Sequence, residues 1–454
     1  MELKFPTFPL IFICLTFIFL LLKLFRNCQR FRRTKLPPGP WKLPLIGSLH
    51  HLAIAGSVPH HALRNLARKY GPIMHLQLGE ISAVIISSPR AAKEVLKTHD
   101  LAFASRPKLL SAEIMTYNYI DIAFAPSDGY WRQMRKICTL ELLSLKNVRS
   151  FSSIREDEAF TLVESIQSSL FSPIDLTQKV FSYTNNVVCR TAFGKRFKNH
   201  EELKPLITEL AGSAGGFDVA DLFPSIKILQ VISDLKLPIT INSIKAIILD
   251  IFSAGTDTSA TAVEFAMAEM MRHPRVLAKA QAELRQILRG KDRIRETDLE
   301  GVSYLKMVIK ETIRLHPPLP LSIPRVCTEH REIDGYDIPI NTEVILNVLA
   351  INRDPEYWKD AESFKPERFA DGLIEFKGTN FEYIPFGGGR RICPGISFGL
   401  ANVEFLLAQL LYHFNWKLPD GMKPEDLDMT EILGLTVRRK KTLYMVPTHR
   451  TPLG

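Results

Sequence analysis

The chain has 454 residues and a formal net charge of +10, and 46% of its residues are hydrophobic. This composition is globular and excludes a disordered or repetitive chain, while six scattered cysteines exclude a disulfide framework and fit a reducing compartment. By the usual prior, the length suggests about three domains.

An apolar segment opens the chain and covers about residues 5–22, which is marginally long enough to span a bilayer. A cleaved signal peptide is the rival interpretation. No small-residue cleavage site follows, however, and the positive charge lies after the apolar run rather than before it. We therefore predict a retained anchor at 1–24, a basic and proline-rich hinge at 25–40, and a cytosolic body at 41–454. The basic residues after the segment are Lys23, Arg26, Arg30, Arg32, Arg33 and Lys35.

The next part of the chain predicts a hairpin and a loop. Residues 73–78 and 81–87 are rich in β-forming residues and flank Gly79, so they predict two paired strands. Residues 89–98 predict a short helix. Residues 102–126 lack a clean period but contain apolar and aromatic side chains such as Met115, and we expect a loop over a cavity.

Trp131 and Arg135 are four residues apart at the start of a predicted helix and therefore share one face. An indole N–H and a guanidinium placed together could bind a carboxylate, although an ordinary amphipathic helix has the same pattern. From 151 to 210 the pattern is helical, with a break near Ser172.

One long helix is predicted over residues 242–272, and it carries the run AGTDTS at 254–259. Ala254 and Thr258 lie four apart with Gly255 between them, so one face combines a gap with a hydroxyl. A structural kink is the alternative explanation, because glycine and threonine disturb the helical ladder.

Glu311 and Arg314 stand at positions i and i+3 of a further helix. On a surface, such an ion pair would contribute little. The sequence LHPP at 315–318 ends that helix, and we expect His316 to be structural. Residues 333–336 and 344–348 resemble strands and predict a small second sheet.

Near the C-terminus, the run FGGGRRICPG at 386–395 places Cys393 in a glycine-rich loop ahead of a predicted helix at 397–414. The glycines allow the backbone to approach a flat ligand, and the helix N-terminus should lower the pKa of the thiol and hold a thiolate. A single thiolate suits an axial haem ligand, and a buried structural cysteine is the alternative. A zinc site is disfavoured because the nearest upstream cysteine is Cys327, and the loop lacks the Gly-Lys-Ser/Thr of a phosphate loop.

The same run resembles the haem-binding signature FxxGxRxCxG of the cytochrome P450 family. All of its fixed positions match, and WxxxR, the AGTDTS run and ExxR follow the family order. The closest likeness is to plant microsomal members that hydroxylate sesquiterpenes. The matching positions of the signature are Phe386, Gly389, Arg391, Cys393 and Gly395.

The resemblance implies one large, mainly helical domain with small sheets, which replaces the three-domain prior. It assigns Cys393 as the axial ligand of haem b, and Thr258 and Asp257 to proton delivery. Haem contacts would come from Trp131, Arg135, Arg325, Phe386, Arg391 and Gly395. The structural ion pairs would join Glu311, Arg314 and Arg368. The substrate pocket would include Met115, Ala254, Leu321, Ile323 and Leu435.

The implied activity is hydroxylation of a small apolar terpenoid with O2. Electrons would come from NADPH through a reductase that docks on a basic face near the cysteine loop. The implied location is the endoplasmic reticulum membrane, with a single span and a cytosolic catalytic domain, and no nucleic-acid partner is expected. A haem-thiolate isomerase or dehydratase is the alternative activity, and the Asp257–Thr258 pair argues against it.

This chain departs from the family pattern between its two halves. In plant members, several tens of residues separate the stretch at 221–236 from the stretch that begins at 237. They form part of the lid over the substrate channel and the helices beneath it. Here the two stretches join directly near 236–237, so an inactive membrane-bound variant is a further alternative.

Overall fold

The computed structural model describes residues 35–54, 58–196, 219–225, 243–419, 421–432, 434 and 436–450, without the side chains of residues 220 and 243–251. The predicted anchor at 1–24, most of the hinge and the junction near 236–237 lie outside the described residues. Within the described part of the chain, no helix combines the length and the apolar character needed to cross a membrane.

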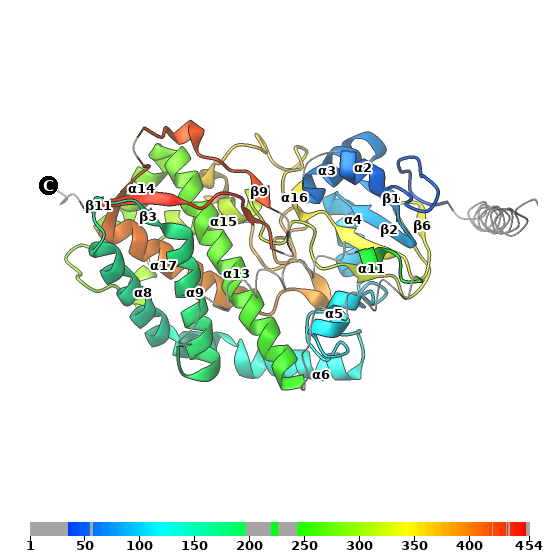
Figure 1. Cartoon of the computed structure of the whole chain (residues 1–454), viewed down its shortest axis with the longest axis horizontal. Coiled ribbons are helices and arrows are strands. Elements are labelled where there is room, and N and C mark those ends of the chain that lie inside the picture. Colours follow the sequence, from blue (N-terminus) through cyan, green and yellow to red (C-terminus); the bar gives the residue numbers. More distant parts are fainter. Residues whose placement is uncertain are drawn as a thin grey trace, which may run out of the picture.

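The fold is mainly helical with small sheets, as the sequence predicted (Figure 1). Most of the long helices gather at one end of the molecule, and the largest sheet lies at the other. The helices are α2 (Leu49–Ile54), α3 (Pro59–Tyr70), α4 (Pro89–Lys93), α5 (Leu110–Met115), α6 (Gly129–Ile137), α7 (Leu145–Ser150), α8 (Ser152–Gln167), α9 (Leu176–Phe193), α11 (Val219–Leu222), α13 (Ser243–Arg272), α14 (Pro274–Ile287), α15 (Tyr304–Leu315), α16 (Val348–Ile351) and α17 (Ile396–His413).

The strands form four small sheets. The largest has the order β1-β2-β7-β4, and the others have the orders β3-β11-β8, β10-β9 and β5-β6. The strands are β1 (Ile73–Leu78), β2 (Ile81–Ile86), β3 (Ile174–Asp175), β4 (Arg325–Val326), β5 (Arg331–Ile333), β6 (Tyr336–Ile338), β7 (Glu343–Leu346), β8 (Phe414–Lys417), β9 (Glu431–Ile432), β10 (Arg438–Arg439) and β11 (Tyr444–His449).

The predicted hairpin is present, since β1 and β2 pair antiparallel around Gly79, which adopts a φ of +61°. The predicted second sheet is only partly right. β5 and β6 do form a separate hairpin, whereas β7 joins the first sheet parallel to β2. The last three residues of β7 read VIL and are all buried, so this apolar run suits a central strand.

The expected loop at 102–126 contains the short helix α5, with Met115 as its last residue. The expected break near Ser172 is real, because α8 ends at Gln167 and α9 begins after β3. Asp175 caps α9 by accepting a hydrogen bond from the Gln178 backbone N–H at 2.7 Å.

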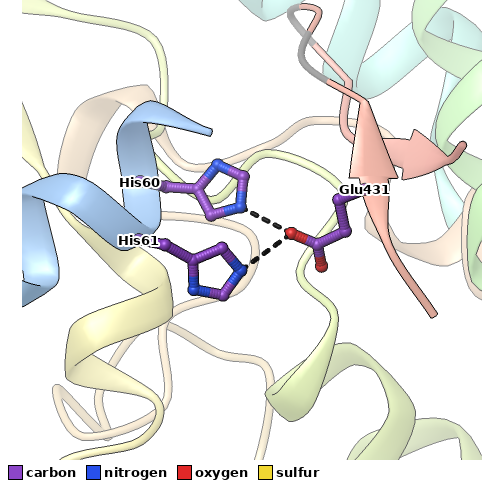
Figure 2. Close-up of side chains that lie close together, drawn as sticks. All are labelled: His60, His61 and Glu431. Carbon is purple, nitrogen blue, oxygen red and sulfur yellow. Dashed lines mark hydrogen bonds and ion pairs between the residues drawn. The ribbon is translucent and has the colours of Figure 1, made fainter. Parts of the chain in front are cut away.

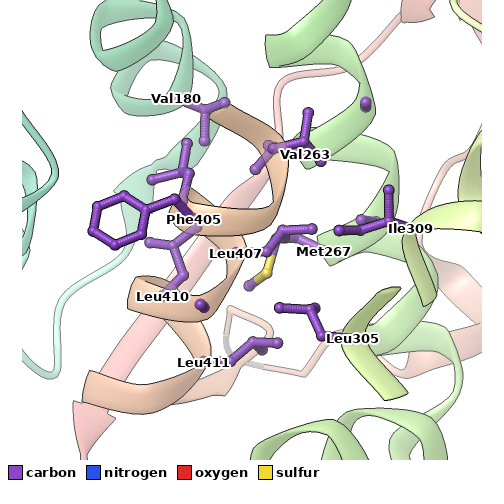
Figure 3. Packing of buried hydrophobic residues seen from close by; sticks show 14 of the residues in the cluster. Val180, Val263, Met267, Leu305, Ile309, Phe405, Leu407, Leu410 and Leu411 are labelled. Atoms are coloured by element: carbon purple, nitrogen blue, oxygen red, sulfur yellow. The ribbon is translucent and has the colours of Figure 1, made fainter. Parts of the chain in front are cut away.

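The main hydrophobic core lies where α13, α15 and α17 meet, and α9 adds to it from the side (Figure 3). Met267, Leu305 and Leu407 belong to this core and are fully buried. α17 is apolar on most of its circumference, which is the pattern of a helix surrounded by protein. The central position of α17 holds the loop that precedes it against the helical core.

Candidate functional site

The loop before α17 is held in a conformation that requires glycine. Gly387 and Gly389 adopt φ values of +70° and +65°. A Cβ atom on Gly389 would lie 2.2 Å from the Leu96 carbonyl oxygen and 2.6 Å from a carboxylate oxygen of Asp100. The Cys393 backbone N–H donates to the Phe386 carbonyl oxygen at 3.0 Å and closes the loop three residues before α17 begins.

The pKa of the Cys393 thiol differs from the value predicted from its position before a helix. Burial raises the pKa of Cys393, although the Gly395 backbone N–H and the Arg135 guanidinium act in the opposite direction. The backbone N–H thus lowers the pKa as expected, but loss of hydration outweighs it, so the net shift of the thiol pKa is opposite to the predicted one. A bound metal ion would reverse this balance, since a coordinating thiol loses its proton.

Four buried or half-buried arginines cluster beside this loop: Arg106, Arg135, Arg325 and Arg391. Burial lowers the pKa of Arg325 to about 10, and burial together with the neighbouring Arg325 lowers the pKa of Arg391 to about 9. Burial lowers the pKa of Arg106, and electrostatic repulsion from the other three arginines lowers it further. The cluster is therefore a concentrated positive charge next to a cysteine.

Backbone carbonyls and one indole ring hold these guanidinium groups in place. Arg325 donates to the Gly388 carbonyl oxygen at 3.0 Å, Arg391 to the Ala104 carbonyl oxygen at 2.6 Å, and Arg135 to the Ile392 carbonyl oxygen. The Arg391 guanidinium lies 3.9 Å from the centre of the Trp131 ring. The Trp131 indole N–H donates to the Ile122 carbonyl oxygen at 3.1 Å.

These residues fit haem b. Its propionates are two negative charges, and the arginine cluster supplies buried positive charge for which the nearby aspartates only partly compensate. Asp100 lies 3.6 Å from Arg325, and Asp121 attracts Arg106 and Arg391. A thiol for the iron and cations for the propionates thus stand in one place.

The Glu311 carboxylate lies between two guanidinium groups, the arrangement that the resemblance predicted. It accepts hydrogen bonds from Arg314 at 2.7 and 2.9 Å and from Arg368 at 2.9 Å. Glu311 and Arg314 are completely buried. Arg314 also donates to the carbonyl oxygens of Asn352 and Ala361, so the group ties α15 to the chain that leads toward the cysteine loop.

The AGTDTS run of α13 packs against the start of α17. A Cβ atom on Gly255 would lie 3.1 Å from Val188 and 3.7 Å from Phe398, so a glycine permits this close approach. Thr258 donates its hydroxyl to the Ala254 carbonyl oxygen at 2.6 Å. Asp257 is buried, and its carboxylate lies 2.5 Å from Arg438 of β10.

The predicted pocket residues do not share one hydrophobic cluster. Met115 is buried in a cluster that Ile323 contacts, whereas Leu321 belongs to a different cluster beneath the largest sheet. Ala254 is exposed on α13. Leu435 lies outside the described residues.

Sequence reasoning did not select Arg106 or Arg438. Arg106 could have been selected as a candidate site residue, because it is the one arginine in the largely apolar stretch 102–126. Arg438 could not have been selected from the sequence, since its ion pair with Asp257 of α13 depends on the fold of the C-terminal strands.

Known proteins match this chain along most of its length. The cytochrome P450 family matches residues 37–230 and 218–446. Premnaspirodiene oxygenase from Hyoscyamus muticus is 54% identical and the alignment covers 97% of this chain and 98% of that protein. The 5-epiaristolochene 1,3-dihydroxylase of Nicotiana tabacum is 50% identical (97% and 98% covered), and a germacrene A hydroxylase of Saussurea costus is 47% identical (99% and 100% covered).

Solved structures share the fold. Zebrafish cytochrome P450 structures with abiraterone and with progesterone superpose with TM-scores of 0.72 and 0.73, at 23% and 24% sequence identity. Each comparison covers 87% of this chain and 99% or more of the zebrafish chain. With the family match and these relatives, the chain belongs to the cytochrome P450 family and is a monooxygenase.

Proposed function

We propose that this chain hydroxylates a small apolar terpenoid, with a sesquiterpene as the most suitable substrate to test. The observation that carries the proposal is the contact between the AGTDTS segment of α13, at Gly255 and Ser259, and the start of α17, at Phe398 and Gly399. The three named relatives support the substrate class, because each is an oxygenase or hydroxylase of that kind.

In this proposal Cys393 holds the iron of haem b, and Arg135, Arg325 and Arg391 hold its propionates. Trp131 packs on Arg391 and fixes that guanidinium. The bound haem supplies the oxygen-activating chemistry. Thr258 holds a proton donor near that centre, and Asp257 passes protons toward it, while Met115 and Ile323 contribute apolar surface for the substrate.

An NADPH-dependent reductase is the proposed electron source, and a retained N-terminal span is the proposed anchor in the endoplasmic reticulum membrane. The basic residues after Leu22 support that orientation. Protease treatment of sealed microsomes tests the orientation: the catalytic domain should be digested from outside, and its protection inside the vesicles would contradict the proposal.

The activity test uses microsomes that contain the full chain and a plant reductase, supplied with sesquiterpene hydrocarbons under ¹⁸O₂. An alcohol that carries one ¹⁸O atom and forms only with NADPH would support hydroxylation. A rearranged or dehydrated product formed without O2 would instead favour the isomerase or dehydratase.

Cysteine variants separate haem ligation from general folding. Cys393→Ala should abolish the thiolate-type carbon-monoxide band of the reduced protein. Cys189→Ala is the matched control, because Cys189 is a buried cysteine of α9 that lies far from Cys393 in the sequence. The Cys189→Ala variant should keep the band. A normal band in Cys393→Ala would exclude Cys393 as the ligand.

A further inference from the structure

Two adjacent histidines of α3 converge on one carboxylate of β9 (Figure 2). The Nε2 atoms of His60 and His61 lie 2.6 and 3.0 Å from the same oxygen of Glu431. One potential ligand atom from each of these three residues lies within 4.8 Å of those of the other two. No other group of three such residues with this spacing occurs within the described part of the chain.

A third histidine faces the cluster from the position that directly follows α15. His316 Nδ1 lies 3.7 Å from the other oxygen of Glu431, and this buried nitrogen makes no hydrogen bond within the described residues. His316 Nε2 lies 2.7 Å from a Glu269 oxygen. A carboxylate on one ring nitrogen fixes the proton there and leaves the other nitrogen as a lone-pair donor, which is how metal-binding histidines are commonly oriented.

We propose that His60, His61 and Glu431 form a binding site for a divalent transition ion, with Zn²⁺ as the fitting ion. Imidazole nitrogen and carboxylate oxygen are ordinary zinc ligands, with bonds of about 2.0–2.2 Å. Around a tetrahedral ion with bonds of that length, ligand atoms lie roughly 3.3 Å apart. The nitrogen-to-oxygen distances here are 2.6 and 3.0 Å, so small movements of the three side chains would admit the ion. The fourth position is open to water, and His316 Nδ1, 3.7 Å from the other Glu431 oxygen, is a further donor beside the cluster.

The burial of the cluster also suits a bound ion. The His60 side chain is completely buried and that of Glu431 is 8% exposed, while the His61 side chain is 34% exposed and offers a route of entry. Arg353 is the cation that opposes an added positive charge, because it acts electrostatically on His60 and Glu431. Its guanidinium donates to Glu362 at 2.9 Å and to the Leu315 carbonyl, so its charge is partly balanced.

The site would link parts of the fold that are distant in the sequence. α3 packs beside β1 of the largest sheet, whereas β9 pairs with β10, which carries the Arg438 partner of Asp257. An ion that joins α3 to β9 would therefore stabilise the C-terminal strands. This role is separate from oxygen chemistry and holds whatever the substrate is.

The test uses the full-length, tag-free holoenzyme in detergent or nanodiscs, stripped with a chelator and then supplied with Zn²⁺ alone. Zinc and iron are counted by mass spectrometry after removal of free ion, and the zinc absorption edge reports the ligand types. We expect one zinc per haem iron, nitrogen and oxygen ligands near 2.0–2.1 Å, and a zinc-dependent rise in melting temperature.

The chain contains its own control, since His50 and His51 of α2 form a second histidine pair, in which the ring nitrogens contact the carbonyls of Gly47 and Trp41. His61→Gln should weaken zinc binding at least tenfold, and His51→Gln should leave it unchanged. His61→Asp, which restores an oxygen ligand, should recover part of the affinity. Less than half a zinc per haem in the unmodified protein would overturn the proposal, as would equal zinc affinity in His61→Gln. Haem content, read from the carbon-monoxide spectrum, confirms that each variant is folded.

Discussion

The Asp257 carboxylate lies 2.5 Å from the guanidinium of Arg438, and the aspartate is almost completely buried. Asp257 sits in the middle of α13, while Arg438 comes from β10 near the C-terminus. The proposed proton carrier is therefore held by a cation from another part of the chain, and the C-terminal strands help to set its position.

Loss of this guanidinium should destabilise the protein. Arg438→Gln leaves a buried carboxylate with less compensation, so we expect the free energy of unfolding to fall by about 1–3 kcal/mol. Denaturant titration followed by tryptophan fluorescence measures the change. Lys440→Gln, at an exposed position two residues on, should alter stability by less than about 0.5 kcal/mol. Equal effects of the two variants would contradict a role for the Arg438 ion pair.

Thr258→Ala should divert electrons away from product. The hydroxyl donates to the Ala254 carbonyl within its own helix, so its loss should change stability by less than about 1 kcal/mol. We expect a normal carbon-monoxide spectrum and several-fold less product per NADPH consumed, with the difference appearing as peroxide. Thr258→Ser keeps the hydroxyl and should recover much of the coupling. Unchanged coupling in Thr258→Ala would remove this residue from proton delivery.

Glu311→Gln should impair folding and haem uptake together. It removes the negative charge between Arg314 and Arg368, and breaking a buried ion pair typically costs about 3–5 kcal/mol. The yield of carbon-monoxide-competent protein measures the effect. Glu367→Gln is the control, because Glu367 is 39% exposed and pairs with Lys279 at 3.2 Å on the surface. A normal yield in Glu311→Gln would show that the buried charge is dispensable.

The elements around the haem site could be predicted from the sequence because their signals are local. The glycines before Cys393, the spacing of Glu311 and Arg314, and the apolar period of α13 each lie within a few residues. Arg368 could be added only through the family resemblance, since its contact with Glu311 is a tertiary one.

The remaining features depend on competing tertiary effects. The pKa of Cys393 could not be predicted from its position before a helix, because burial by other elements outweighs the helix N-terminus. β7 was predicted as a strand, but the choice of β2 as its partner comes from packing. Leu321 is apolar and close in sequence to Ile323, yet the chain between them directs the two side chains into different clusters.

His75 should make the protein less stable in mild acid. Burial, helped by the Lys42 ammonium, lowers the pKa of His75 from 6.5 to about 3. The unfolded chain takes up this proton as the pH falls below 6.5, whereas the folded protein does so only near pH 3. Stability is therefore lost as the pH falls through that window, by about 2 kcal/mol between pH 7 and pH 5. Urea titrations at the two pH values test this, and His75→Gln should show a smaller pH dependence. An equal dependence would assign the acid sensitivity to other groups.

The chain is shorter than its relatives in the region between its two halves. The alignment with premnaspirodiene oxygenase spans 495 positions, which exceeds the 454 residues of this chain by 41, so at least 41 positions have no counterpart here. The family also matches in two segments that overlap over residues 218–230, close to the expected junction near 236–237. In the relatives, the missing residues would cover an apolar pocket and exclude water from the oxygen chemistry.

We therefore expect this chain to bind haem yet to hydroxylate poorly, with most NADPH used for peroxide. A chimaera that carries a relative's segment after Lys236 should raise product per NADPH several-fold and should also raise the melting temperature, since it covers apolar surface. A second chimaera with a glycine- and serine-rich insert of equal length controls for chain length alone. Equal coupling and equal melting temperature in all three proteins would show that the segment is dispensable.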